Sequence, residues 1–188
     1  MSRTLLATLA ALALVAACSK QDPFDEAFIA KDLKAHPTQE IYEKADGFQY
    51  DPPASARVTP AQMTSVVQVL KLAAQIRSVA EKDFGSDVDR TSGAGDRRAR
   101  FTESMAALGA ARAYATAELR ASLNLGFNPR EEDWIAKQVR TANASLQQLE
   151  KLEGTDAGDK WTEAQDPALL SNIELVRKHR EELKEWMP

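Results

Sequence analysis

The sequence predicts an all-α fold, in the form of an antiparallel bundle of four long helices with a shorter helix at the N-terminal end. Apolar residues recur at intervals of three and four over four long stretches, which is the period of a helix with one buried face. The side chain of a capping residue accepts a hydrogen bond from a free N–H, and a following proline lacks the N–H that would remain unpaired. Four such pairs indicate helix starts: Asp22-Pro23, Thr59-Pro60, Asn128-Pro129 and Asp166-Pro167.

The composition fits one globular domain. Of the 188 residues, 44% are apolar and 28% are charged, and the net charge is −4. This acidic balance disfavours a nucleic-acid partner, since proteins that bind nucleic acids usually carry an excess of Lys and Arg. The single cysteine excludes a disulfide framework, a cysteine-based zinc site and an iron–sulfur cluster within the chain.

The first residues have the pattern of a secretory signal. Arg3 supplies a basic start, residues 5–17 are apolar except for Thr8, and small residues precede Cys18. The apolar run is shorter than the roughly 20 residues that span a bilayer. We therefore interpret residues 1–17 as a signal peptide and not as a membrane span.

The end of this signal, Val15-Ala16-Ala17-Cys18, resembles the lipobox of bacterial lipoproteins. The resemblance implies cleavage before Cys18 and attachment of a diacylglyceryl thioether and an N-acyl chain to that residue, which anchors the protein in a membrane. Ser19 follows instead of Asp, which in the enterobacterial sorting rule implies the outer membrane, facing the periplasm of a Gram-negative bacterium. The alternative is an ordinary signal peptide with a cysteine there by chance.

Residues 22–188 are predicted to form the single folded domain, after the lipidated cysteine and a short tether at residues 18–21. Glycine-containing polar stretches indicate loops at residues 85–95 and 155–165. Helices are expected at residues 23–34, 39–45, 60–84, 98–123, 129–153 and 167–187.

Two of these helices have faces that can be assigned. The helix at residues 98–123 is expected to bury Phe101, Met105, Leu108, Ala111, Ala115 and Leu119. The helix at residues 60–84 is expected to be the most buried, because its polar residues form only a narrow stripe. Its apolar residues are Met63, Val66, Val67, Val69, Leu70, Leu72, Ala73, Ile76, Val79 and Ala80.

The sequence has no Glu-x-x-His pair, no zinc-protease motif, no haem-attachment motif and no phosphate-binding loop, so we expect neither a cofactor nor a metal. His36 and His179 remain as candidates. One alternative is a haem held by His179 together with Met63 or Met105 on a facing helix. The other is that both histidines are structural, with the charge of His36 complementing the dipole at a helix end.

Two acidic clusters are also explained without catalysis. Glu131-Glu132-Asp133 opens a predicted helix, where the helix dipole favours acids. Glu181, Glu182 and Glu185 alternate with basic residues on a predicted solvated face. General acid–base chemistry needs a pocket, and no sequence pattern predicts one, so we expect that the protein is not an enzyme.

Arg90, Arg97, Arg98 and Arg100 form a basic cluster in an otherwise acidic protein. The last three lie near a predicted helix start, where the dipole disfavours cations. We interpret the cluster as a candidate contact with an anionic partner, such as a lipid headgroup, lipopolysaccharide or an acidic protein. The alternative is a solvated loop in which neighbouring aspartates pair with the arginines.

These observations predict a non-enzymatic, lipid-anchored helical module of the cell envelope that binds a protein or another envelope component. Two alternatives stay open. One is a carrier of a small ligand or haem in the bundle core, and the other is an envelope hydrolase.

Overall fold

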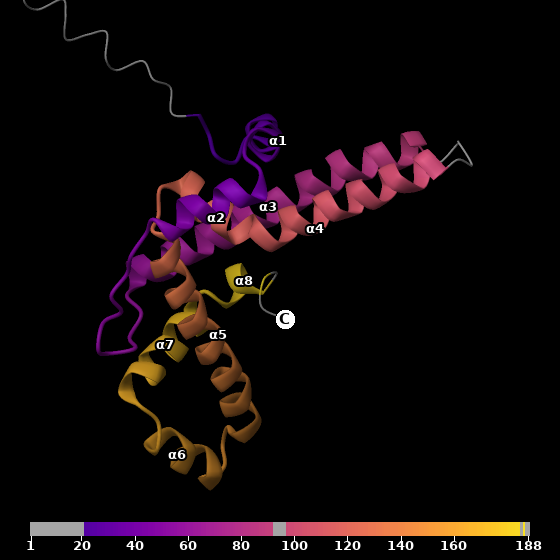
Figure 1. The fold of residues 1–188 in the computed structure, drawn as a ribbon. Helices are drawn as coiled ribbons and strands as arrows, with labels where there is room; N and C mark the ends of the chain where they lie inside the picture. The colour runs from indigo at the N-terminus through magenta and orange to yellow at the C-terminus, as the bar shows by residue number, and fades with distance from the viewer. Residues whose placement is uncertain (1–20, 92–96, 185, 187–188) are drawn as a thin grey trace, which may run out of the picture.

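The computed structural model describes residues 21–91, 97–184 and 186, with the side chains of residues 84–104 and 106 outside the description. Within these ranges all regular secondary structure is helical, which confirms the predicted all-α class (Figure 1). The helices are α1 (Glu26–Ala35), α2 (Thr38–Asp46), α3 (Pro60–Thr91), α4 (Arg97–Leu125), α5 (Pro129–Leu152), α6 (Asp156–Glu163), α7 (Pro167–Lys178) and α8 (Arg180–Leu183).

The helices are arranged around one long antiparallel pair. Figure 1 shows α3 and α4 side by side, with α5 and α7 set at a steep angle against one end of the pair. Helices α1 and α2 pack on α3 and α4, respectively. The predicted antiparallel bundle of four long helices is therefore not confirmed in that detail, because α5 and α7 do not run along the α3–α4 pair.

Helix α3 is the central element, as predicted. Thr59 and Gln62 cap it reciprocally, with Thr59 N–H donating to Gln62 Oε1 (3.0 Å) and Gln62 N–H donating to Thr59 Oγ1 (3.2 Å). All ten apolar residues predicted to be inward are buried. Nine of the ten, all except Ala80, belong to two apolar clusters, one shared with α5 and α7 and one shared with α1 and α4, so α3 is flanked by helices on two sides.

The predicted end of this helix at residue 84 is wrong, and so is the predicted loop over residues 85–91, because α3 continues to Thr91. Residues 92–95 of that loop lie outside the described residues. A glycine inside a helix costs roughly 1 kcal/mol relative to alanine, which is a small penalty beside the packing gained along a long helical pair. Gly85 therefore does not end α3.

The predicted buried face of α4 is also wrong for four of its six residues, whereas Leu119 is half-buried and the side chain of Phe101 lies outside the described residues. Met105 and Leu108 are 49% and 42% exposed, and Ala111 and Ala115 are exposed as well. The buried residues of α4 are instead small ones and one arginine: Ala113, Thr116, Ala117, Arg120, Ala121 and Ser122. Ala117 and Ala121 share an apolar cluster with α3. Small side chains let the two helix backbones approach closely, whereas larger apolar side chains on that face would separate them.

Helix α1 begins later than predicted. Asp22 accepts from Phe24 N–H in a turn, and Asp25 is the cap, accepting from Phe28 N–H (2.8 Å). Thr38 lies inside α2 and is not its cap; Pro37 precedes it without a side-chain hydrogen bond. Arg120 on α4, only 2% exposed, donates to Asp32 Oδ2 (3.2 Å) and to the carbonyl of His36 (2.7 Å), which fixes this end of the chain.

The C-terminal part confirms two predicted caps and corrects two predicted elements. Asn128 accepts from Arg130 N–H, and Asp166 accepts from Ala168 N–H. The predicted loop at residues 155–165 contains α6, capped by Thr155. The predicted single helix at residues 167–187 is interrupted at His179, which divides α7 from α8.

Candidate functional site

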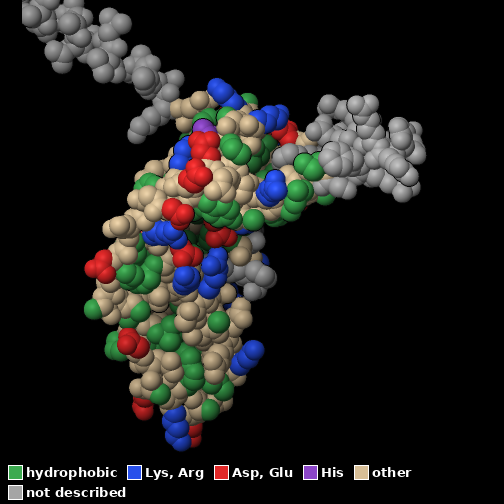
Figure 2. All heavy atoms as spheres, in the orientation of Figure 1, with side chains coloured by type: hydrophobic (Ala, Val, Ile, Leu, Met, Phe, Trp, Pro, Cys, Tyr) green, Lys and Arg blue, Asp and Glu red, His purple; other side chains and the backbone are tan. Residues whose placement is uncertain are grey.

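A cleft of about 320 Å³ opens where α2, α3, α4 and α5 meet. Its volume lies at the lower end of the range of small-molecule sites. Figure 2 shows basic and acidic side chains gathered on this face of the molecule, where the α3–α4 pair meets the rest of the fold. The apolar part of the lining comes from Val66, Val69, Leu70, Ala115, Leu119 and Ala136.

Glu132 is the buried carboxyl of this lining, with 6% of its surface exposed. The first turn of α5 places it one helical turn before Ile135 and Ala136, which are both buried. Ser65 on α3 donates to Glu132 Oε1 at 2.7 Å. The second oxygen, Oε2, has no hydrogen-bond partner.

The environment of Glu132 favours its neutral form. Its pKa is raised to about 7, mainly because burial disfavours the charged carboxylate. The hydrogen bond from Ser65 acts in the opposite direction, and the negative charge of Glu131 adds to the rise. A carboxyl with a pKa near 7 can lose or accept a proton at physiological pH.

The other acids of the lining are each matched by a cation. Asp46 pairs with Arg130 (2.7 Å), and Asp133 pairs with Lys137 (2.7 Å). Glu118 accepts from Arg77 and Arg140, at 3.1 Å in both cases. Among the described residues of the cleft, Glu132 is thus the carboxyl without a basic partner.

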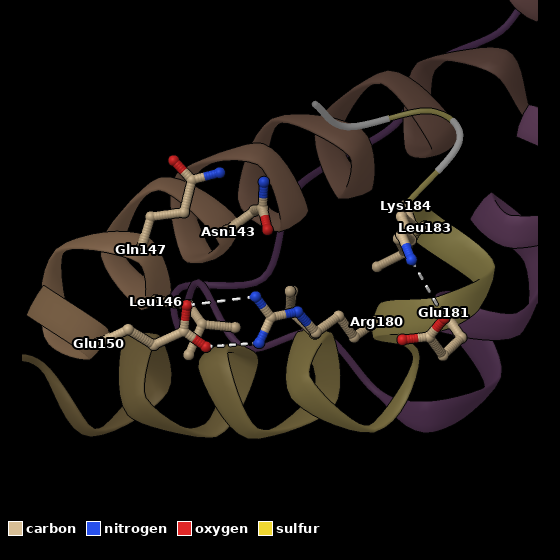
Figure 3. A pocket seen from close by; sticks show the side chains of 9 residues that line it. Asn143, Leu146, Gln147, Glu150, Arg180, Glu181, Leu183 and Lys184 are labelled. Carbon is tan, nitrogen blue, oxygen red and sulfur yellow. Dashed lines mark hydrogen bonds and ion pairs between the residues drawn. The ribbon is translucent and has the colours of Figure 1, made fainter. Parts of the chain in front are cut away.

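A second hollow, of about 350 Å³, lies between α5 and the α7–α8 segment. Figure 3 shows Arg180 facing both carboxylate oxygens of Glu150, with nitrogen–oxygen distances of 2.6 and 3.3 Å. Lys184 lies 3.8 Å from Glu181. The charged groups of this hollow already pair with one another and are largely exposed. The hollow therefore leaves fewer unpaired groups for a ligand than the Glu132 cleft does.

The structure describes the predicted site residues only in part. Cys18 lies outside the described residues. Arg90 lies near the end of α3, and Arg97, Arg98 and Arg100 lie in the first turn of α4, but their side chains are outside the description. Their contact with an anionic partner therefore stays a prediction.

Each of the two histidines lies within hydrogen-bond distance of a nearby glutamate. His36 Nδ1 lies 2.9 Å from Glu40 Oε1, and His179 Nδ1 lies 2.7 Å from Glu182 Oε2. Met63 is fully buried in the cluster shared with α5 and α7, whereas Met105 is half exposed on α4. The structure does not bring His179 and Met105 together, so it adds no support to the haem alternative.

Sequence reasoning explained Glu132 by the helix dipole at the start of a predicted helix and missed its burial. The available signal was its position in the helical period, since Glu132 precedes Ile135, Ala136 and Val139 by three, four and seven residues. This spacing places its side chain on the buried face of α5.

Comparison with known proteins adds no assignment: no family model matches the chain, and no curated protein or solved structure matches it significantly. In the part of the chain that the structure describes, no helix combines the length and apolar character needed to cross a bilayer. Within the same residues, no group of three or more His, Cys, Asp and Glu side chains is placed to hold a metal ion.

Proposed function

We propose that the chain is a lipid-anchored helical module of the cell envelope that acts by binding a protein or another envelope component. The observation that carries this proposal is the position of the lipobox cysteine directly before the folded domain. Only residues 19–21 separate Cys18 from Asp22, where the turn that leads into α1 begins. Three residues reach at most about 11 Å, so the domain would sit close to the membrane surface.

The uncovered face of α4 supports a binding role. Met105 and Leu108 are 49% and 42% exposed and lie three residues apart on the helix that also carries Arg97, Arg98 and Arg100 in its first turn. Exposed apolar side chains gathered on one element are typical of interaction surfaces. The arginines would add recognition of phosphate or carboxylate groups at the end of the same helix.

The other two functions have weaker support. An envelope hydrolase would use a pocket that gathers several buried carboxyls, and the described part of the Glu132 cleft contains one. A carrier of a small ligand is compatible with this cleft, but it requires no lipid anchor. The lipid-anchored binding module accounts for two separate observations, the lipobox in the sequence and the exposed face of α4.

Site-specific photocrosslinking in the native envelope tests the proposal. A crosslinker placed at Leu108, on the exposed face of α4, should give a discrete adduct. The same group at Lys137, an exposed position on α5, should not. Loss of the Leu108 adduct in a Cys18→Ser chain would tie the contact to the anchor, whereas equal adducts at both positions would contradict a specific surface.

A further inference from the structure

We propose that the Glu132 cleft binds a small organic ammonium ion, with the charged nitrogen held by the Glu132 carboxylate and the carbon body held by the apolar lining. This inference concerns a different part of the molecule from the proposed envelope contact. It does not depend on the lipid anchor or on the exposed face of α4.

The unpaired oxygen of Glu132 carries the first part of the argument. A buried polar atom without a partner loses free energy, so native structures rarely contain one unless a ligand or water completes it. Glu132 Oε2 is such an unpaired buried atom, and Glu132 lines a cleft of about 320 Å³. When Glu132 is ionised, the missing partner is a donor, because a carboxylate only accepts hydrogen bonds.

The surrounding charges give the second part. The other carboxyls of the lining, Asp46, Glu118 and Asp133, already have basic partners. Glu132 has only the hydroxyl of Ser65. A cationic donor is therefore the complement that this site lacks, and an anionic ligand would meet Glu132, Glu118 and Asp133 with like charge.

The apolar lining gives the third part. Val66, Val69 and Leu70 from α3 face Leu119 from α4 and Ala136 from α5 across the cleft. These apolar residues accommodate a short hydrocarbon chain. The donors of the lining, Tyr42, Ser122 and Arg130, make no hydrogen bond to Glu132 Oε2. An ammonium ion on an aliphatic body matches both the walls and the carboxyl.

An NMR titration of the full chain tests the proposal with three matched probes: butylammonium, 1-butanol and butyrate. Butylammonium should shift the amide signals of Ser122 and Ala136 in the lining and approach saturation. 1-Butanol, which has the same carbon chain without the charge, should bind about tenfold more weakly, and butyrate should not bind.

Two variants separate the role of Glu132 from a general charge effect. Glu132→Gln preserves the shape of the neutral side chain and should weaken butylammonium binding about tenfold. Glu43→Gln removes an exposed charge on α2 that lies outside the cleft lining and should leave binding unchanged. Equal binding of butylammonium and 1-butanol, retained binding in Glu132→Gln, or no binding to the wild-type chain would each overturn the proposal.

A pH series keeps the test independent of how Glu132→Gln folds. Butylammonium, like a lysine side chain, stays charged between pH 5 and 8. The titratable and charged groups that face or adjoin Glu132 are Tyr42 and Asp46 on α2, Glu118 on α4, and Arg130, Glu131 and Asp133 on α5, while the α3 lining contributes none. Binding should be weaker at pH 5, where Glu132 is protonated, than at pH 8, and pH-independent binding would overturn the assignment.

Discussion

The Ser65 hydroxyl on α3 donates a 2.7 Å hydrogen bond to Oε1 of Glu132 on α5. The bond joins two helices at a point where Glu132 is almost fully buried and its second oxygen is unpaired. Because burial favours the protonated form of the carboxyl, the packing of α5 on α3 is coupled to proton binding.

Stability should therefore fall as the pH rises from about 4.5 to about 7. Burial raises the pKa of Glu132 to about 7 in the folded chain, from an ordinary value of 4.5. Below pH 4.5 both states hold the proton. Between the two values the folded state binds more protons than the unfolded state, so raising the pH destabilises the fold. The full effect is about 3 kcal/mol, reached above pH 7 and measurable by denaturant unfolding at a series of pH values.

Glu132→Gln isolates this contribution, since the amide cannot ionise. The variant should be more stable than the wild type at pH 8, by up to about 3 kcal/mol, and close to it at pH 4. Ser65→Ala should destabilise the chain more at pH 8 than at pH 4, because hydrogen bonds to charged groups are the stronger ones. An equal effect of Glu132→Gln at both pH values would show that the carboxyl does not titrate in this range.

The central position of α3 predicts different costs at two adjacent residues. Leu70 is 4% exposed in the cluster shared with α5 and α7, whereas the side chain of Lys71 is 47% exposed beside Glu182. Leu70→Ala should cost about 2–5 kcal/mol of unfolding free energy. Lys71→Ala should stay within about 0.5 kcal/mol. Similar small losses at both positions would mean that this face of α3 is solvent-exposed.

Arg120 should be the most costly charged residue to remove. Its replacement by alanine leaves Asp32, whose side chain is 10% exposed, without a cation, and such uncompensated burial costs about 3–5 kcal/mol. Arg140→Ala, in the exposed pair with Glu118, is the matched control and should cost at most about 1 kcal/mol. Thermal unfolding of the two variants measures the difference, and equal losses would contradict a buried role for Arg120.

The sequence predicted best those elements whose apolar residues have a clear period and whose ends carry strong caps. Helix α3 has both, and all its predicted inward residues are buried. Helix α4 has neither, because alanines occupy several of its faces and any of these faces can pack. The choice between Ala117 and Ala115 as the buried residue depends on how closely α3 can approach, and this is a tertiary property.

Two further elements were missed for reasons of local chemistry. The polar stretch that forms α6 has no continuous apolar stripe. A Cβ atom at Gly158 would lie 2.6 Å from the carbonyl oxygen of Leu152, so the glycine lets α6 pack closely against the end of α5. The break between α7 and α8 occurs at His179, whose N–H is shared by the carbonyls of Leu175 and Val176. The other predictions depended on the spacing of apolar residues and on proline at helix starts, and neither signal marks Gly158 or His179.

The basic cluster at the start of α4 should bind anionic surfaces. Replacing Arg97, Arg98 and Arg100 with alanine should preserve helicity, since the helix dipole disfavours cations at this end. The same replacement should weaken binding to anionic liposomes, and the difference from wild type should shrink as salt is added. Liposome co-sedimentation across salt concentrations measures both effects, and full binding by the triple variant would assign the arginines to the solvated alternative.

Mass spectrometry of the mature N-terminus tests whether the chain is lipid-anchored. We expect the chain isolated from the membrane to begin at Cys18, with a diacylglyceryl group on the sulfur and an acyl chain on the amino group. Cys18→Ser should leave the uncleaved precursor, because the lipid-modified cysteine is the substrate for cleavage. A mature chain with an unmodified Cys18, or efficient cleavage of Cys18→Ser at the same position, would contradict the assignment of the protein as a lipid-anchored module.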